Sequence, residues 1–275
     1  LGQLAQKNVS NVVIINFNNE KEGKGYPTKE SILKAIADVR AEKLEAYVDN
    51  VKDEPIMTTM PKKGSIKKEI KNDKLGFTEL QLSNGAKVIL KKTDLKADQV
   101  LLSGEGFGGA SLYGKEDYIN FKVFGNAMNA SGLGNFSNTE LQKALAGKIA
   151  SASLDVSRTR VNVDGSSTPN DVETMLQLVH LYFTNIKKDE KSFASLLSGI
   201  ETTLRNAEVS PETAFNDSVT ATLTAHNLYD RDLKLADLKD INYDRILQIA
   251  KEQTANAAAF TFTIVGNYDE ATIRP

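Results

Sequence analysis

Residues 77–94 constrain the fold of this chain more strongly than any other stretch. Two short runs with apolar side chains at alternate positions flank the dipeptide Asn84-Gly85. Asn-Gly favours positive φ at both turn positions, which suits the tight turn that matches the twist of two paired strands. The apolar positions are Leu80 and Leu82 on one arm, and Val88 and Leu90 on the other. The segment therefore predicts a β-hairpin, which opens a folded unit that we expect to run to Val265.

The composition narrows the classes of function. The chain has 275 residues and a formal net charge of −2, with both signs interspersed. Because it has no basic excess to release counterions, we do not expect a nucleic-acid partner. The absence of cysteine argues against a disulfide framework and against thiolate metal sites. No apolar run approaches the roughly 18 residues that span a bilayer, so we expect no membrane partner.

The first part of the chain is expected to lie outside the main domain. LGQLAQKNVS lacks the pattern of a secretion signal and does not begin with Met, so we interpret the chain as a piece of a longer one. A buried strand is predicted at 11–17, followed by a helix with Thr28 as N-cap and an apolar stripe that reaches Val51. Pro55 ends this helix, and residues 53–74 mix Pro, Gly and lysines without a period, which indicates a linker.

The remaining residues alternate between strand-like and helix-like patterns. Predicted strands lie at 99–103, 149–156, 158–164 and 259–265. Predicted helices lie at 117–128 and 193–204, and others begin at Ser137, Thr168, Ser210 and Asn242. The helix at Ser137 has a capping box with Glu140 and is closed by Gly147. This order predicts an α+β fold, a mostly antiparallel sheet with helices packed mainly on one face.

Two similar segments, one near each end of the chain, suggest how the chain is divided into repeats. NVVIINFNN near the start and FTFTIVGNYD near the end are both apolar strands that finish in an Asn-containing turn. A chain that holds the last strand of one repeat and nearly all of the next would show this similarity between its first and last strands. The predicted domains are a tail of a preceding homologous repeat at 1–52, a linker at 53–74, and an α+β domain at 75–275.

Five runs between residues 77 and 275 carry a family resemblance through their order along the chain. They are TELQLSNGAKVILKKTD, SGEGFGGASLYG, FSNTELQKALAGKIASAS, STPNDVETMLQLVHLYFTN and FTFTIVGNYDEATIRP. In this order they resemble the insulinase/pitrilysin-type zinc metallopeptidases. The resemblance implies several homologous α+β repeats, in two halves that close around a chamber holding the peptide substrate. Usually one repeat keeps zinc, and the others are structural or contact the substrate.

The resemblance also implies where zinc would lie. The active repeat carries H-x-x-E-H on the helix after its third strand, where two imidazoles ligate the metal and the carboxylate activates water. The matching region here, 118–139, contains no His, Glu or Asp. We therefore expect no catalytic, cofactor-binding or metal-binding residue in this chain, with zinc held by another repeat of the parent. The expected partners are the catalytic half of the same polypeptide and a peptide substrate.

Other motifs have simpler explanations. His180 is interpreted as a partly buried residue of a helix. His226 and Asp230 have i, i+4 spacing, but no third ligand is signalled, and the two histidines are expected in different helices. Residues 104–109 satisfy G-x-G-x-x-G, but no helix follows directly, which favours a kinked strand over a dinucleotide site. Ser65 and Lys68 match S-x-x-K by chance, within lysines that alternate with acidic residues and indicate a solvated connector.

The main hypothesis is a non-catalytic domain of a larger zinc metallopeptidase that forms part of the wall of its substrate chamber. The alternative is a stand-alone structural or peptide-binding protein of the same fold without peptidase activity. A zinc enzyme with unusual ligands is a third hypothesis. An H-x-x-E-H motif upstream in the full-length sequence would support the first, and its absence would support the second.

Overall fold

The computed structural model describes residues 14–16, 25–43, 52 and 54–274. Contacts divide the chain into two compact units, Leu1–Asn50 and Val51–Pro275, and each is described by itself. Within the described residues, no helix is both long and apolar enough to cross a bilayer.

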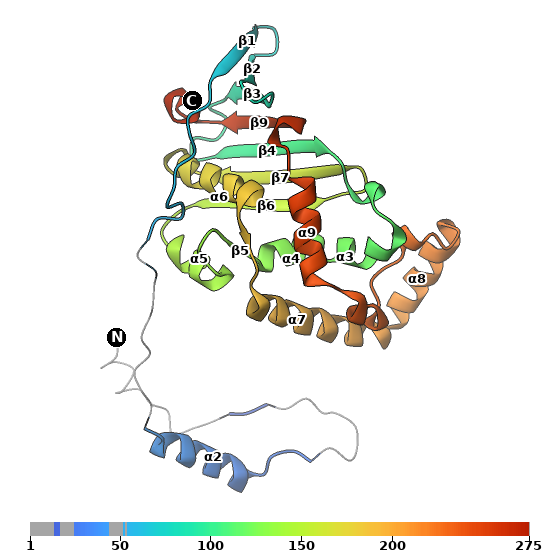
Figure 1. The fold of residues 1–275 in the computed structure, drawn as a ribbon. Coiled ribbons are helices and arrows are strands. Elements are labelled where there is room, and N and C mark those ends of the chain that lie inside the picture. Colours follow the sequence, from blue (N-terminus) through green and yellow to red (C-terminus); the bar gives the residue numbers. More distant parts are fainter. Residues whose placement is uncertain (1–13, 17–24, 44–51, 53, 275) are drawn as a thin grey trace. The chain divides into compact units, whose positions relative to one another are not determined.

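One mixed sheet forms the centre of the larger unit (Figure 1). Its seven strands lie in the order β1-β2-β3-β9-β4-β7-β6, and all neighbours are antiparallel apart from the parallel pair β3–β9. The strands are β1 Ile66–Asn72, β2 Phe77–Leu82, β3 Lys87–Lys92, β4 Val100–Phe107, β6 Ala150–Val156, β7 Arg160–Ser167 and β9 Phe260–Gly266. A small second sheet pairs β5 Gly132–Leu133 with β8 Ile186–Lys187. The predicted mostly antiparallel α+β fold is confirmed.

The predicted hairpin is the pair β2–β3, in which Leu80 lies opposite Val88. Its turn differs from the predicted one, because Gly85 has φ 98° but Asn84 does not take positive φ. The Leu82 N–H donates to the Ala86 carbonyl at 2.9 Å, so the loop comprises residues 83–85, an arrangement that needs one left-handed residue at its end. Asn84 contributes through its side chain, whose Oδ1 accepts from the Ala86 N–H at 3.1 Å.

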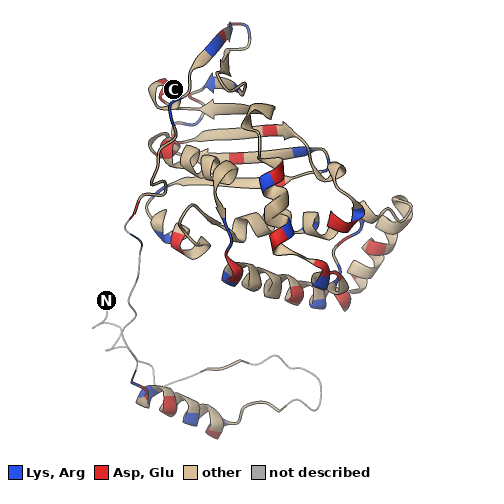
Figure 2. Cartoon of the chain, in the orientation of Figure 1, with Lys and Arg blue, Asp and Glu red and all other residues tan. Residues whose placement is uncertain are grey.

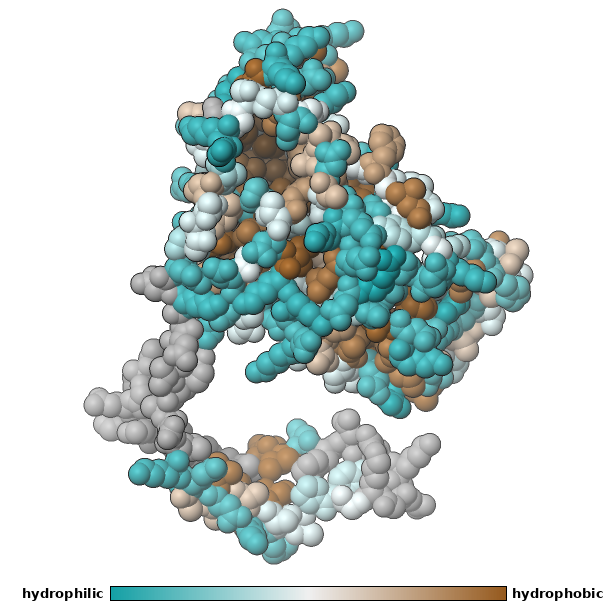
Figure 3. Space-filling model, in the orientation of Figure 1, coloured by the Kyte–Doolittle hydropathy of each residue, from teal (hydrophilic) through white to brown (hydrophobic). Residues whose placement is uncertain are grey.

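The prediction of a linker over 53–74 is wrong for β1, which pairs with β2 along its whole length. β1 reads IKKEIKN and exposes most of its side chains, so it lacks the apolar alternation of a strand with one buried face. As the edge of the sheet it is rich in lysine, which discourages pairing with another chain. Figure 3 shows this end of the molecule as a hydrophilic surface. Earlier in the predicted linker, Met57 also joins the hydrophobic core.

The glycine-rich run 104–109 is not a kink but begins as regular strand. Gly104 and Gly106 lie on β4, where a Cβ would come within 2.7 Å of the Phe262 ring and 2.9 Å of the Phe260 ring. These glycines therefore make room for two aromatic rings on the neighbouring strand β9. Only after β4 does the backbone turn sharply, at Gly109, where φ is 91°.

Helices cover one face of the sheet, with α6 and α9 crossing it in Figure 1. The helices are α3 Tyr118–Lys122, α4 Phe124–Ala130, α5 Asn138–Ala144, α6 Val172–Thr184, α7 Glu190–Glu208, α8 Pro211–Leu223, α9 Tyr243–Gln253 and α10 Glu270–Ile273. Short 3-10 helices lie at Ala110–Leu112, Lys115–Asp117, Pro169–Asp171, Leu228–Asp230, Leu235–Asp240 and Ala257–Ala259. The predicted capping box of Ser137 and Glu140 is present at the start of α5.

The helix predicted at 117–128 is interrupted. Val123 lies between α3 and α4 with φ −113° and ψ 3°, and its N–H donates to the Asn120 carbonyl rather than continuing the helical ladder. Both Val123 and Phe124 are almost fully buried, so tertiary packing overrides the helical periodicity at this point. The break begins a new helix, α4, which packs against β6.

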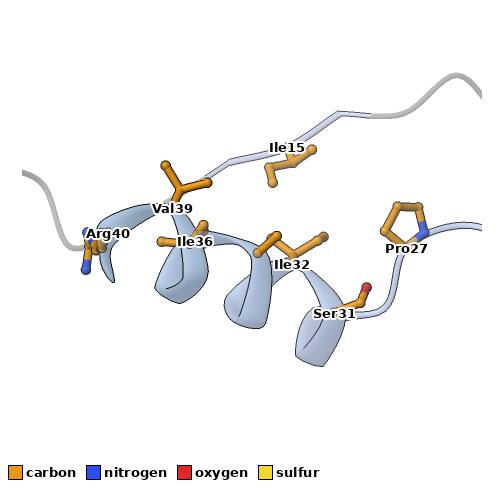
Figure 4. A pocket seen from close by; sticks show the side chains of 8 residues that line it. Ile15, Pro27, Ser31, Ile32, Ile36, Val39 and Arg40 are labelled. Atoms are coloured by element: carbon orange, nitrogen blue, oxygen red, sulfur yellow. The ribbon is translucent and has the colours of Figure 1, made fainter. Parts of the chain in front are cut away.

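In the smaller unit, α2 Lys29–Ala41 begins where the sequence predicts, with the Thr28 side chain accepting from the Ser31 N–H at 3.2 Å. The predicted stripe beyond Lys43 and most of the predicted strand at 11–17 lie outside the described residues, and residues 14–16 form no strand. α2 has no buried residue. Its apolar side and Ile15 line a hollow of about 600 Å³ (Figure 4).

Candidate functional site

The segment α3–α4 follows the third and fourth strands, where the resembled family carries its metal motif in active repeats. The side chains that this segment buries are Tyr118, Ile119, Asn120, Val123, Phe124, Ala127 and Met128. Hydrocarbon, one phenol, one amide and one thioether offer none of the imidazole or carboxylate ligands that zinc typically takes. Across the described part of the chain, no group of three or more His, Cys, Asp or Glu could hold a metal ion.

The carboxylate next to this segment is already engaged. Asp117 is 5% exposed and accepts two hydrogen bonds from Arg245 on α9, at 2.9 Å from Nε and 2.7 Å from Nη2. These bonds lower the pKa of Asp117 and raise the pKa of Arg245. One turn later, the Asn120 Oδ1 accepts from the Asn242 N–H at 2.8 Å. The buried polar groups around α3 therefore fasten it to α9.

A second set of hydrogen bonds holds the end of α4. The Tyr243 hydroxyl lies 2.8 Å from Ser131 Oγ and accepts from the Asp189 N–H at 3.1 Å, while its ring stacks on Phe193 with centroids 4.0 Å apart. Burial raises the pKa of Asp189, but the N–H groups of Ser192 and Asn138 donate to its carboxylate and outweigh burial, so the pKa is lowered. Each polar group here is hydrogen-bonded to another group of the fold. This is expected for contacts that hold helices together and not for a reactive centre.

The two histidines lie apart from this segment. His180 is on α6, as predicted, and partial burial lowers its pKa. His226 is not in a helix, which corrects the prediction: it follows the end of α8 in a left-handed turn with φ 56°. Because Asp230 belongs to the next 3-10 helix and pairs with the Asn227 amide at 2.6 Å, the i, i+4 spacing creates no helical pair. Neither motif brings ligands together.

Among the described residues of the larger unit, no helix covers the opposite face of the sheet, which we call the open face (Figure 1). β4 alternates strictly between buried and exposed residues, and its outward side chains include Leu101 at 45% exposure and Phe107 at 85%. The paired register places further outward residues beside them, namely Thr261, Thr263 and Val265 on β9, and Asn162, Asp164 and Ser166 on β7. This face therefore presents small polar, apolar and charged side chains to whatever lies against the sheet.

The edge strand β6 adds main-chain groups to this surface. Ile149 accepts from Thr168 N–H, and Ser157 N–H donates to Arg160, so the odd-numbered residues of this strand bond to β7. The N–H and C=O groups of Ala150, Ala152 and Leu154 consequently point away from the sheet. Near the end of the strand, the outward N–H of Val156 is bonded by the Asp155 carboxylate at 2.8 Å. Leu154 is only 1% exposed, whereas Ala150 and Ala152 are half-buried, so an extended polypeptide could add to β6 through the groups of these two alanines.

The hydrogen-bonding edge was not predicted as a site, although the alternation in 149–156 predicted its strand. A signal in the sequence could have pointed to it: ASASLDV carries small side chains at successive positions, which leaves the main chain accessible. What the sequence does not reveal is that β6 ends the sheet, since this depends on strand order.

Comparisons with known proteins agree on one kind of relative. No family model matches the chain. It is 26% identical over 248 residues to a zinc protease PQQL-like protein of Arabidopsis thaliana, covering 89% of this chain and 23% of that protein. It is 25% identical over 256 residues to the probable zinc protease PqqL of Escherichia coli (strain K12), covering 92% of this chain and 27% of that protein. The chain thus spans about a quarter of the length of these relatives.

Solved structures share the fold. The periplasmic protease PqqL from Escherichia coli matches with a TM-score of 0.68 and 22% identity, covering 90% of this chain and 27% of that one. A putative M16-like peptidase from Alicyclobacillus acidocaldarius matches with a TM-score of 0.52 and 12% identity, covering 72% and 47%. The chain is thus similar in sequence to PqqL-type zinc proteases and shares the fold of an M16-like peptidase, in agreement with its resemblance to the insulinase/pitrilysin-type peptidases.

Proposed function

We propose that this chain is a non-catalytic repeat of a larger zinc metallopeptidase and forms part of the wall of its peptide chamber. The observation that carries the proposal is the set of side chains on α3–α4. The segment offers no ligating side chain, and the nearest carboxylate, Asp117, is bound to Arg245. Hydrolysis of this kind needs a metal-bound water and a carboxylate to activate it, so zinc is expected in another repeat of the parent.

The open sheet face and the β6 edge support the second half of the proposal. A chamber wall must contact polypeptide without reacting with it, and both surfaces meet this requirement with main-chain groups and unreactive side chains. One wall encloses little of a flexible peptide, so the ordering cost of the peptide is poorly offset. The chain alone should therefore bind unfolded peptides weakly, and binding should tighten markedly when the catalytic half is present.

Two measurements test the proposal. After dialysis against micromolar zinc, elemental analysis should find far less than one zinc per chain, and a zinc content close to one would overturn the non-catalytic assignment. Titration of a labelled unfolded peptide, with and without the catalytic half, then tests the wall. If no peptide binds in either arm, the chain is not a wall of a peptide chamber.

A stand-alone peptide-binding protein of the same fold is the second candidate, and the outward main-chain groups of Ala150 and Ala152 favour it equally. The titration separates the two. Binding by the isolated chain that is as tight as binding by the pair would mean that the chain is a complete binding module.

A further inference from the structure

Positive and negative side chains lie on different strands of the open sheet face. Across the register, Lys87 on β3 lies opposite Thr261 on β9, which lies opposite Glu105 on β4. We call the outward lysines of β1 and β3 the basic side; they are Lys68, Lys87 and Lys91. The outward carboxylates of β4, β7 and β6 form the acidic side; they are Glu105, Asp164 and Asp155. Figure 2 shows blue on β1 and β3, and red on β4 and β7.

Neighbouring charges reduce this separation without removing it. On the basic side, Glu79 of β2 projects from the same face and offsets one lysine. On the acidic side, Glu105 is bound by Arg160, whose guanidinium also lies over the Phe107 ring. Each side keeps an excess of its own sign.

The charges that remain have no ion-pair partner in the described part of the chain. Lys68, Lys87 and Lys91 make no salt bridge there, and neither do Asp155 and Asp164. Asp155 lies at the rim of the face, where a side chain at Gly125 of α4 would come within 3.0 Å of its Oδ1. The three lysines and Asp164 are thus available to charges on another molecule, whereas the Asp155 Oδ1 accepts from the Val156 N–H at 2.8 Å.

A neutral band separates the two sides. It consists of Thr261, Thr263 and Val265 on β9, together with Leu101 and Ser103 on β4. Strands lie about 4.8 Å apart, so the distance from β3 is about 10 Å to β4, about 14 Å to β7 and about 19 Å to β6. An extended peptide advances about 3.3 Å per residue, so it covers these distances in about three to six residues.

We propose that this face selects extended polypeptide segments in which acidic residues, over β3, are separated by about three to six residues from basic residues over β4, β7 and β6. The inference rests on the proposed function and specifies its substrate class. Because the charge axis runs across the strands, the selected segment crosses the face. A peptide added to the β6 edge runs along the strands instead and would not satisfy both sides.

The test compares two peptides of the same composition and length, about 20 residues. One places an Asp pair and a Lys pair on either side of three neutral residues, with centres about 16 Å apart when extended. The other interleaves the same charges. Exposed ion pairs contribute about 0.2–1 kcal/mol each, so the segregated peptide should bind about fivefold more tightly at low salt. The preference should shrink at high salt because exposed charges are screened.

A matched pair of variants assigns the preference to this face. K87E/K91E reverses two lysines that face outward. K71E/K92E makes the same change of net charge on β1 and β3, but these lysines point to the other face and line a hollow with Thr78 and Leu90. The first variant should abolish the preference for the segregated peptide, and the second should keep it. Thermal melts check that both remain folded.

The outcomes separate this inference from the function on which it rests. Equal binding of the two peptides, or equal effects of the two variants, would overturn the charge selection while leaving the chamber wall in place. Failure of both peptides to bind, with the catalytic half present as well as absent, would overturn both proposals.

Discussion

The two faces of the central sheet are made from the same strands but differ in almost every physical respect. On the covered face of β4, Leu102 is 4% exposed and packs in the core, whereas Phe107 on the open face is 85% exposed. The covered face encloses aromatic rings so tightly that Gly104 and Gly106 are required opposite them. The open face carries Lys87, Lys91 and Asp164, which have no ion-pair partner in the described residues. The comparison teaches that stability and recognition can be assigned to alternate residues of one strand.

The largest expected effect contrasts two phenylalanines. Phe124 on α4 is fully buried beneath the covered face, so Phe124→Ala should destabilise the chain by about 3–5 kcal/mol through lost packing and a cavity. Phe107→Ala removes an exposed ring of the open face and should change stability by less than about 0.5 kcal/mol. Urea unfolding measures both. Similar losses for the two variants would contradict the division between faces.

The next effect concerns the ion pair between Asp117 and Arg245, which holds α3 against α9. Asp117→Asn removes the charge that receives two hydrogen bonds from Arg245, and should cost about 2 kcal/mol. Glu116→Gln, an exposed neighbour on the same 3-10 helix, is the control and should change little. An equal loss in both variants would show that general charge, rather than this contact, matters.

The Asp117–Arg245 ion pair also predicts that the free energy of unfolding depends on pH. Hydrogen bonds from Arg245 lower the pKa of Asp117 in the folded state below the unfolded value of about 3.9. The stabilisation is therefore complete above that value and is lost as the pH falls through the folded-state pKa. Acid titration of the unfolding free energy should be steeper for the wild-type chain than for Asp117→Asn. Parallel curves would refute the assignment.

A smaller effect is expected at the β6 edge, where binding rather than stability should change. Ala152→Pro removes an outward N–H that does not take part in the ladder with β7. Ala152→Ser keeps that N–H and is the matched control. One lost hydrogen bond of about 1 kcal/mol corresponds to about fivefold weaker peptide binding. Measurements should use the chain together with the catalytic half, and identical affinities of the two variants would remove the edge from the binding surface.

The smallest effect lies away from both faces and serves as a reference for the comparison. Ala225 adopts φ 52° after α8, a left-handed conformation that costs a residue with a Cβ about 1 kcal/mol. Ala225→Gly should therefore stabilise the chain by about 0.5 kcal/mol, after the entropy cost of glycine in the unfolded state. Ala214→Gly inside α8 should have the opposite sign. Thermal melts report both, and peptide binding should stay unchanged.

Local patterns in the sequence were reliable where neighbouring residues determine the outcome. The β2–β3 hairpin, the Thr28 cap and the Ser137–Glu140 capping box all depend on groups a few residues apart, and all are present. Prediction failed where distant packing decides. β1 was missed because an edge strand needs no apolar alternation, and the break at Val123 was missed because burial in the core overrode a helical pattern.

The sequence by itself determined that 118–139 carries no imidazole or carboxylate, and that segments typical of a peptidase repeat follow in order. These conclusions concern residue types and their order, which need no coordinates. Only the tertiary structure decided what surrounds them: that Arg245 binds Asp117, 128 positions earlier in the chain, that β6 is an edge, and that Lys87 and Glu105 share one face. The reason is physical. Strand order and ion pairs arise from contacts between residues far apart in sequence, and no local propensity specifies them.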